Sequence, residues 1–151
     1  ELNTEQKTAT AVQDLSFSCQ PGRVFSLLGP NGAGKTTTLR MIATLIAPTA
    51  GQIHINGINA LSQPQEARKH IGFLTGSTGL YARLTPMEVI DYYADLYGVE
   101  KAAREQRKEE LFSLLHMQDF LHKRIGKLST GMKQKVSICR TMIHDPSVVK
   151  F

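Results

Sequence analysis

One stretch of the sequence has the residue types and spacing of a phosphate-binding loop. Residues 29–36 fit the pattern G-x-x-x-x-G-K-[ST]. Glycines let successive backbone N–H groups turn inward around phosphates, Lys35 can reach the β- and γ-phosphates, and Thr36 offers a hydroxyl to Mg²⁺. A helix that follows would point its positive end at the anion. The stretch predicts a nucleoside triphosphate site made of Gly29, Pro30, Asn31, Gly32, Ala33, Gly34, Lys35, Thr36 and Thr37, with Thr36 as the Mg²⁺ ligand.

The flanking residues predict the elements that would hold this loop. Residues 23–28 are mostly apolar and favour a buried strand, and the apolar residues after the loop recur at helical spacing. Residues 11–19 partly alternate between apolar and polar, and Pro21-Gly22 is typical of a turn. We expect 11–19 and 23–28 to form an antiparallel hairpin, with a helix after residue 34.

The rest of the chain predicts a mixed α/β architecture. Short strands are expected at 52–55, before the tight turn Asn56-Gly57, and at 71–74, with a short helix at 64–70 between them. Thr85 and Glu88 form a capping box ahead of a helix that Gly98 would end, and residues 86–120 read as helices only. The fold class predicted is α/β: a P-loop NTPase core, whose mixed sheet has antiparallel N-terminal strands, plus an α-helical subdomain.

Composition narrows the function classes. The net charge of +5 comes from dispersed basic residues, and those at 101–108 alternate with glutamates, which is typical of a solvated helix face, so no nucleic-acid partner is expected. Neither the two cysteines nor the five histidines have metal-ligand spacing, and the cysteines read as reduced packing residues. No run of eighteen apolar residues and no leader sequence is seen, so we expect a cytoplasmic chain.

A second motif opens a later helix. Ser129-Thr130-Gly131-Met132 precedes an apolar face made of Met132, Val136, Cys139 and Ile143. A serine hydroxyl and unhindered N–H groups at a helix N-terminus suit a phosphate. The same residues also suit ordinary helix capping, and taken alone the motif does not choose between these two readings.

Together, the two motifs resemble those of ABC-type ATPases. Residues 128–135, Leu-Ser-Thr-Gly-Met-Lys-Gln-Lys, resemble the signature motif, usually Leu-Ser-Gly-Gly-Gln, in an export-type form, and residues 71–81 look most like the sodium-extruding subgroup. The resemblance implies a head-to-tail dimer in which Ser129, Thr130, Gly131 and Met132 contact the ATP of the partner subunit. It also implies membrane-spanning partner subunits, and so a peripheral position on the inner face of the cell membrane. The groove for those subunits would lie near 73–97, where we place Leu80, Tyr81 and Leu84, although local core packing explains these three equally well.

The resemblance also implies a division into a P-loop core at 1–75, a helical subdomain at about 76–135 that carries the signature, and a return to the core at 136–151. The chain departs from the pattern in four places. Residues 147–151 align with the strand that should deliver an Asp-Glu pair, and neither that pair nor a later histidine is present, so we expect a C-terminally truncated domain that binds ATP with near-background hydrolysis. Lys150 is a charge in a strand expected to be apolar, no aromatic residue precedes Phe17 to stack on adenine, and Gly76 stands where a glutamine is usual.

Three readings therefore remain. The first is the ATP-binding subunit of an ABC exporter, for Na⁺ or drug efflux, with ATP and Mg²⁺ as cofactors. The second is a non-transport ABC-type ATPase that acts on DNA or ribosomes, although no coiled coil or tandem cassette is present. The third is a hydrolysis-deficient ATP-binding fragment. A P-loop switch or kinase is disfavoured, because Asp95-Leu96-Tyr97-Gly98 sits at a helix end rather than after a strand.

Overall fold

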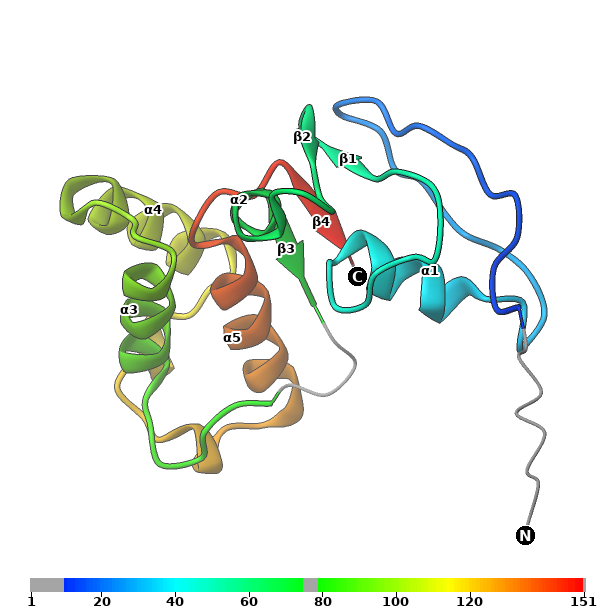
Figure 1. The fold of residues 1–151 in the computed structure, drawn as a ribbon. Helices are drawn as coiled ribbons and strands as arrows, with labels where there is room; N and C mark the ends of the chain where they lie inside the picture. The colour runs from blue at the N-terminus through cyan, green and yellow to red at the C-terminus, as the bar shows by residue number, and fades with distance from the viewer. Residues whose placement is uncertain (1–9, 75–78, 151) are drawn as a thin grey trace, which may run out of the picture.

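The computed structural model describes residues 10–74 and 79–150. Along the chain the elements are α1 (Lys35–Ile42), β1 (His54–Ile55), β2 (Ile58–Asn59), α2 (Pro64–Lys69), β3 (Ile71–Phe73), α3 (Pro86–Leu96), α4 (Lys101–Leu114), the 3-10 turns Gln118–Phe120 and Ile125–Lys127, α5 (Thr130–Met142) and β4 (Val148–Lys150). In Figure 1, α3, α4 and α5 gather on one side and the loop-rich N-terminal part lies on the other. Helix α2 and strands β3 and β4 lie between them. Residues 80–143 are called the helical body below.

The helical body is built around one apolar core. Helices α3, α4 and α5 and both 3-10 turns contribute to it. Its fully buried members include Ile90, Met117, Ile125 and Ile143. The apolar face predicted for α5 is confirmed, since Val136, Cys139 and Ile143 are buried and Met132 packs against them. Burial also raises the pKa of the Cys139 thiol to about 12, which fits a reduced packing residue; Cys19, by contrast, is exposed, so the same prediction is wrong for it.

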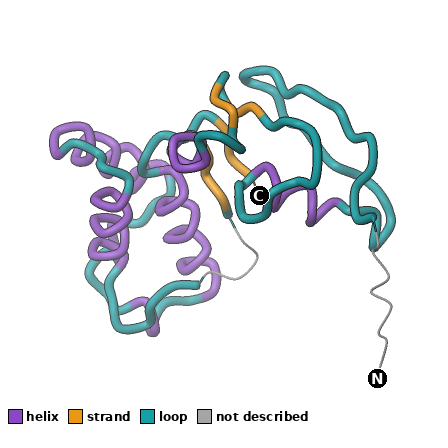
Figure 2. Tube along the Cα trace, viewed as in Figure 1, coloured by secondary structure: helices purple, strands orange, loops and turns teal. Residues whose placement is uncertain are grey.

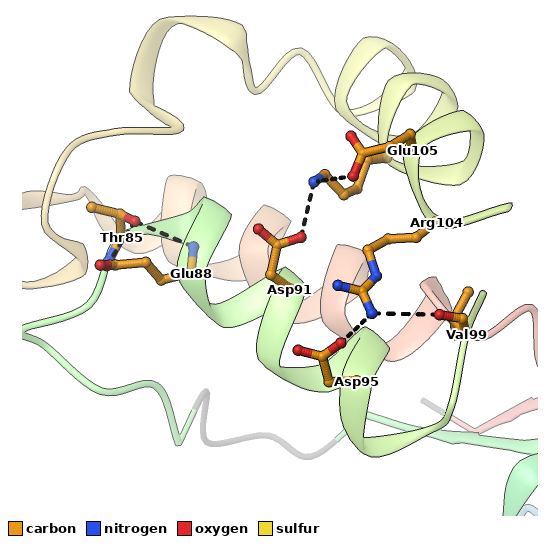
Figure 3. Close-up of polar contacts among 8 residues, drawn as sticks. Thr85, Glu88, Asp91, Asp95, Val99, Arg104 and Glu105 are labelled. Carbon is orange, nitrogen blue, oxygen red and sulfur yellow. Dashed lines mark hydrogen bonds and ion pairs between the residues drawn. The ribbon is translucent and has the colours of Figure 1, made fainter. Parts of the chain in front are cut away.

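Helix α3 begins and ends as its sequence predicts. The Thr85 hydroxyl accepts from the Glu88 N–H at 3.3 Å, and the Glu88 carboxylate accepts from the Thr85 N–H at 2.7 Å (Figure 3). These bonds satisfy two donors that the helix leaves free. The backbone bond from Thr85 lowers the pKa of Glu88, so the cap is made by the ionised carboxylate. Gly98, at φ +67°, ends the helix.

Helix α4 is only partly the solvated face that its charge pattern suggests, since Lys101, Glu105, Glu109 and Glu110 are exposed and Lys108 is buried. The Lys108 side chain is only 9% exposed, and its ammonium donates to Asp91 on α3 at 2.8 Å and to Glu105 at 3.0 Å (Figure 3). Burial alone lowers the pKa of Lys108, but its contacts with these two carboxylates outweigh that effect and the pKa is raised. Arg104 likewise donates to Asp95 of α3. The prediction therefore holds for the exposed residues and is wrong for Lys108, whose acceptor Asp91 belongs to another helix, which the pattern of α4 does not reveal.

The strands form two separate pairs. β1 and β2 are antiparallel across the predicted Asn56-Gly57 turn, in which both residues have positive φ. β3 and β4 are parallel, with Phe73 opposite Lys150. The Lys150 ammonium lies 4.7 Å from the centroid of the Phe73 ring, and this cation–π contact accommodates the charge in the strand.

The N-terminal hairpin predicted for 11–19 and 23–28 is wrong. Figure 2 draws this part as loop, and residues 10–34 hold no strand. Val24 and Leu28 are 97% and 91% exposed. A strand needs a hydrogen-bonded neighbour, and β3 and β4 pair with each other instead. The two segments still meet, since the rings of Phe17 and Phe25 stack at 4.7 Å.

Candidate nucleotide-binding site

The backbone of residues 29–37 has the conformation that the motif predicts. Gly32 and Gly34 have φ of +85° and +79°, in the left-handed region that favours glycine. Helix α1 begins directly after Gly34, so the N–H groups of its first turn have no intrahelical acceptor and can face an anion. Thr38 closes the first turn, because its hydroxyl donates to the Gly34 carbonyl at 3.0 Å. Residues 29–37, called the cradle below, therefore form a loop with the backbone conformation expected of a phosphate site.

Lys35 lies across this cradle. Its ammonium donates to the carbonyl oxygens of Gly29 and Pro30, both at 2.7 Å. These two bonds hold the positive charge at the mouth of the loop rather than out in solvent. The charge is thus placed where phosphate oxygens would compete with the two carbonyls for it.

The cradle opens onto a hollow of about 250 Å³ lined by Ala11 and residues 31–37. Thr36, the predicted Mg²⁺ ligand, is on this lining. The hollow is smaller than the roughly 300–1,000 Å³ typical of complete small-molecule pockets, so it matches the phosphate and metal end of a nucleotide. Its lining has no aromatic side chain to stack on a base. Ala11 is the residue that sequence reasoning missed, and only its contact with Gly34 reveals it: a Cβ on Gly34 would overlap the Ala11 carbonyl.

The signature motif, at residues 129–132, forms the N-terminal cap of α5, and most of it is exposed to solvent. Ser129 is the N-cap of α5, and its hydroxyl accepts from the Met132 N–H at 3.3 Å. Ser129, Thr130 and Gly131 are exposed, and no atom lies within 4 Å of where a Gly131 Cβ would be. Met132 turns inward to the helical core. The capping interpretation is thus confirmed, while three exposed residues still present a free helix N-terminus to solvent.

The chain does not bring the two motifs together. Figure 1 places the start of α1 and the start of α5 on opposite sides of β3. A ligand in the cradle of residues 29–37 is therefore out of reach of Ser129 in the same chain. If both motifs serve one nucleotide, the second must come from another copy.

The remaining predicted positions are divided between core and surface. Leu80 and Leu84 pack against the helical core, so for these two the local-core alternative is confirmed. Tyr81 is 67% exposed and available to a partner. Gly76 lies outside the described residues. Within the described ranges, acidic, histidine and cysteine side chains form no cluster suited to a metal ion, and no helix has the length and apolar character needed to cross a membrane.

Comparison with known proteins decides the family. Residues 12–150 match the family described as ABC transporter. The chain belongs to this family, as an ABC transporter ATP-binding domain. It is 43% identical over 148 residues to the ABC transporter ATP-binding protein NatA of Bacillus subtilis, covering 97% of this chain and 60% of that protein. It is 37% identical over 139 residues to the bacitracin transport ATP-binding protein BcrA of Bacillus licheniformis, covering 92% and 44%.

Solved structures show the same fold. An ATP-binding subunit of an ABC transporter superposes with a TM-score of 0.73 at 33% identity, over 81% of this chain and 51% of that one. A dimeric bacterial ABC transporter cassette superposes with a TM-score of 0.74 at 26% identity, over 92% and 64%. The predicted α/β P-loop NTPase fold class is therefore confirmed. The chain spans about half the length of these relatives, from 44% to 64%.

Proposed function

We propose that this chain is part of the ATP-binding subunit of an ABC exporter and binds Mg-ATP through residues 29–37. The observation that carries the proposal is the cradle itself, with left-handed glycines, a free helix N-terminus and the Lys35 ammonium at one hollow. The relatives named for transport and for ATP binding support it. The resemblance of residues 71–81 to the sodium-extruding subgroup extends the proposal to Na⁺ or drug efflux as the transport step.

In this proposal each residue type has a separate role. Backbone N–H groups of the loop and of the first turn of α1 bind the phosphates, Lys35 neutralises their charge, and the Thr36 hydroxyl holds Mg²⁺. Bound Mg²⁺ would neutralise phosphate charge and orient the phosphoryl oxygens. None of the residues that line the hollow is acidic, so the described cradle offers no carboxylate to orient an attacking water. We therefore expect this chain alone to bind ATP and to hydrolyse it near background.

The proposed assembly is a head-to-tail dimer. Support comes from the exposed Ser129, Thr130 and Gly131, which lie away from the cradle of their own chain and are free to meet the cradle of a second copy. A dimeric cassette among the similar structures also supports it. Membrane-spanning partners on the inner face of the membrane complete the proposal, with the exposed Tyr81 as one contact.

The test is a titration of the chain with a fluorescent ATP analogue and Mg²⁺, comparing Lys35→Ala with Lys127→Ala. Lys127 is an exposed lysine in the helical body and serves as the matched control. Saturable binding that Lys35→Ala weakens at least about tenfold, and Lys127→Ala leaves unchanged, supports the proposal. If the chain recognises the adenine base, GTP should compete poorly with the fluorescent ATP analogue. Equal binding by both variants would contradict the role of the cradle.

A further inference from the structure

The connection between α5 and β4, residues 143–147, is where the helical body meets the parallel sheet. A Cβ on Gly72 of β3 would lie 2.9 Å from Pro146 Cγ and 3.0 Å from the Thr141 carbonyl oxygen. Real Cβ atoms do not approach other atoms so closely, so the backbone of β3 packs directly against this connection. The end of α5 and its connection to β4 are therefore packed directly against the sheet.

One side chain in this connection touches both parts. The His144 ring stacks on the Tyr97 ring, with centroids 3.7 Å apart and planes 4° apart, and Tyr97 is the residue that ends α3. His144 Nε2 lies 3.3 Å from the carbonyl oxygen of Ile71, the first residue of β3. A carbonyl only accepts, so Nε2 carries the proton and donates to it. His144 thus joins the end of α3 to the start of β3.

The other ring nitrogen of His144, Nδ1, determines which charge state of the imidazole stabilises this junction. Nδ1 is buried and has no hydrogen-bond partner in the part of the chain that the structure describes. Protonation would create a buried N–H without an acceptor. Burial accordingly lowers the pKa of His144, although the bond to Ile71 and the charge of Asp145 act in the opposite direction.

The carboxylates around His144 are already paired with another cation. The groups that line a groove of about 490 Å³ with His144 are Lys69 from α2, Tyr97, Arg107 and Glu110 from α4, and Asp145. Arg107 donates to Asp145 at 2.7 Å and to Glu110 at 3.1 Å, so both carboxylates already have a cation. β3 presents only the neutral Ile71 carbonyl. The groove also gives a displaced imidazole room to leave its position.

We propose that His144 is a positioning residue that fixes the helical body on the parallel sheet while its imidazole is neutral, and that protonation releases this lock. Helix α5 runs from the signature motif to this junction, so the lock sets where Ser129 stands relative to the sheet. That consequence for ATP rests on the proposed function, whereas the lock itself does not.

The sign of the pH effect follows from the lowered pKa. The junction is fully stable above the unfolded value of 6.5 and weakens as the pH falls from 6.5 toward the lower pKa of the folded state. Replacing His144 by a residue that does not titrate removes this dependence.

The experiment is hydrogen–deuterium exchange of the 151-residue chain at pH 7.5 and 5.5, corrected for intrinsic exchange. We expect the amides of 71–74 and 97–99 to lose protection at pH 5.5, by up to about tenfold, because this pH lies below the unfolded pKa of 6.5. His144→Phe keeps a ring on Tyr97 but lacks the donor, so it should exchange fast at both pH values. His122→Phe, at an exposed histidine, is the matched control and should behave like the unmodified chain.

Unchanged protection of the unmodified chain at pH 5.5, or fast exchange of His122→Phe at both pH values, overturns the proposal. Mg-ATP titration of the same variants separates this proposal from the proposed function. His144→Phe should bind nucleotide as the unmodified chain does, because neither His144 nor Tyr97 lines the hollow of the cradle. If the unmodified chain fails to bind, the proposed function fails and the exchange result still decides the lock. If His144→Phe loses protection throughout the chain, His144 is a general folding residue and the proposal is wrong.

Discussion

The helical body and the N-terminal part differ in what their large apolar side chains contact. In the helical body, Ile90, Met117, Ile125 and Ile143 are fully buried in one core. In the N-terminal part, seven large apolar side chains are exposed: Leu15, Phe17, Val24, Phe25, Leu28, Leu45 and Ile46. The helical body is therefore held by its own packing, while the helix that follows the cradle packs, through Ile42, only on a smaller core of Ile55, Ala60, Ala67 and Ile71. Nucleotide-binding loops are commonly found in such low-stability regions.

The largest expected effect comes from opening the helical core. Ile90→Ala removes a side chain that is 0% exposed and should lower the free energy of unfolding by about 2–5 kcal/mol. Urea denaturation followed by circular dichroism measures the change. A loss below about 1 kcal/mol would mean that the helical body is packed no better than the N-terminal part.

The next effect concerns the cradle. Gly34→Ala forces an L residue to φ +79° and overlaps the Ala11 carbonyl, at a cost of about 1–3 kcal/mol of local strain. We expect loss of nucleotide binding while the melting of the helical body is unchanged, because the core of the helical body includes no residue of the cradle. Lys127→Ala, at an exposed position of the helical body that belongs to neither motif, is the control and should leave binding intact. If Gly34→Ala also melted the helices, the two parts would be one cooperative unit.

A smaller effect tests the helix cap. Thr85→Ala removes the hydroxyl that accepts from Glu88 and should cost about 1 kcal/mol of stability. The change is measured by thermal unfolding, with Thr130→Ala as control because Thr130 is exposed and is not the N-cap of α5. The Thr85 hydroxyl also donates to the Glu88 carboxylate at 2.8 Å. Because the pKa of Glu88 is lowered, the part of the deficit that comes from this bond is present above pH 4.5 and is lost as the pH falls through the lower folded-state value. A Thr85→Ala deficit that persisted unchanged in strong acid would argue against the ionised cap.

The smallest effect sharpens the contrast with Ile90. Leu28→Ala deletes a similar volume from a side chain that is 91% exposed, so the free energy of unfolding should change by less than about 0.5 kcal/mol. The same denaturation assay measures it. A loss comparable to that of Ile90→Ala would show that residues 23–28 are buried in solution, as a strand would be.

The features that sequence predicted well are those made by neighbours in the chain. The Thr85–Glu88 box spans three residues, and the Asn56-Gly57 turn is formed by the two residues that name it. The phosphate cradle is likewise local, since its conformation comes from its own glycines. Such contacts can be predicted from the sequence because the residues that make them are close neighbours, so their types and spacing also define the local geometry.

The features that sequence missed join distant residues. Arg107 contacts Asp145, 38 positions away, and Lys108 contacts Asp91, 17 positions away. The charge pattern of α4 alone could therefore not show that these two side chains are paired with carboxylates outside the helix. Residues 23–28 have strand-forming composition, but composition does not supply the neighbouring strand. Ala11 lines the hollow only because the chain returns to Gly34, and no motif marks that return.

The two hydrogen bonds of Lys35 restrict which chemical groups can bind in the cradle. The ammonium already has two neutral carbonyl acceptors, from Gly29 and Pro30, at 2.7 Å. An incoming group must offer oxygens that outcompete them, which charged phosphate oxygens do and hydroxyl or amide oxygens do not. The loop therefore discriminates by charge before any contact with the base or sugar, and nucleosides should be excluded without a steric barrier.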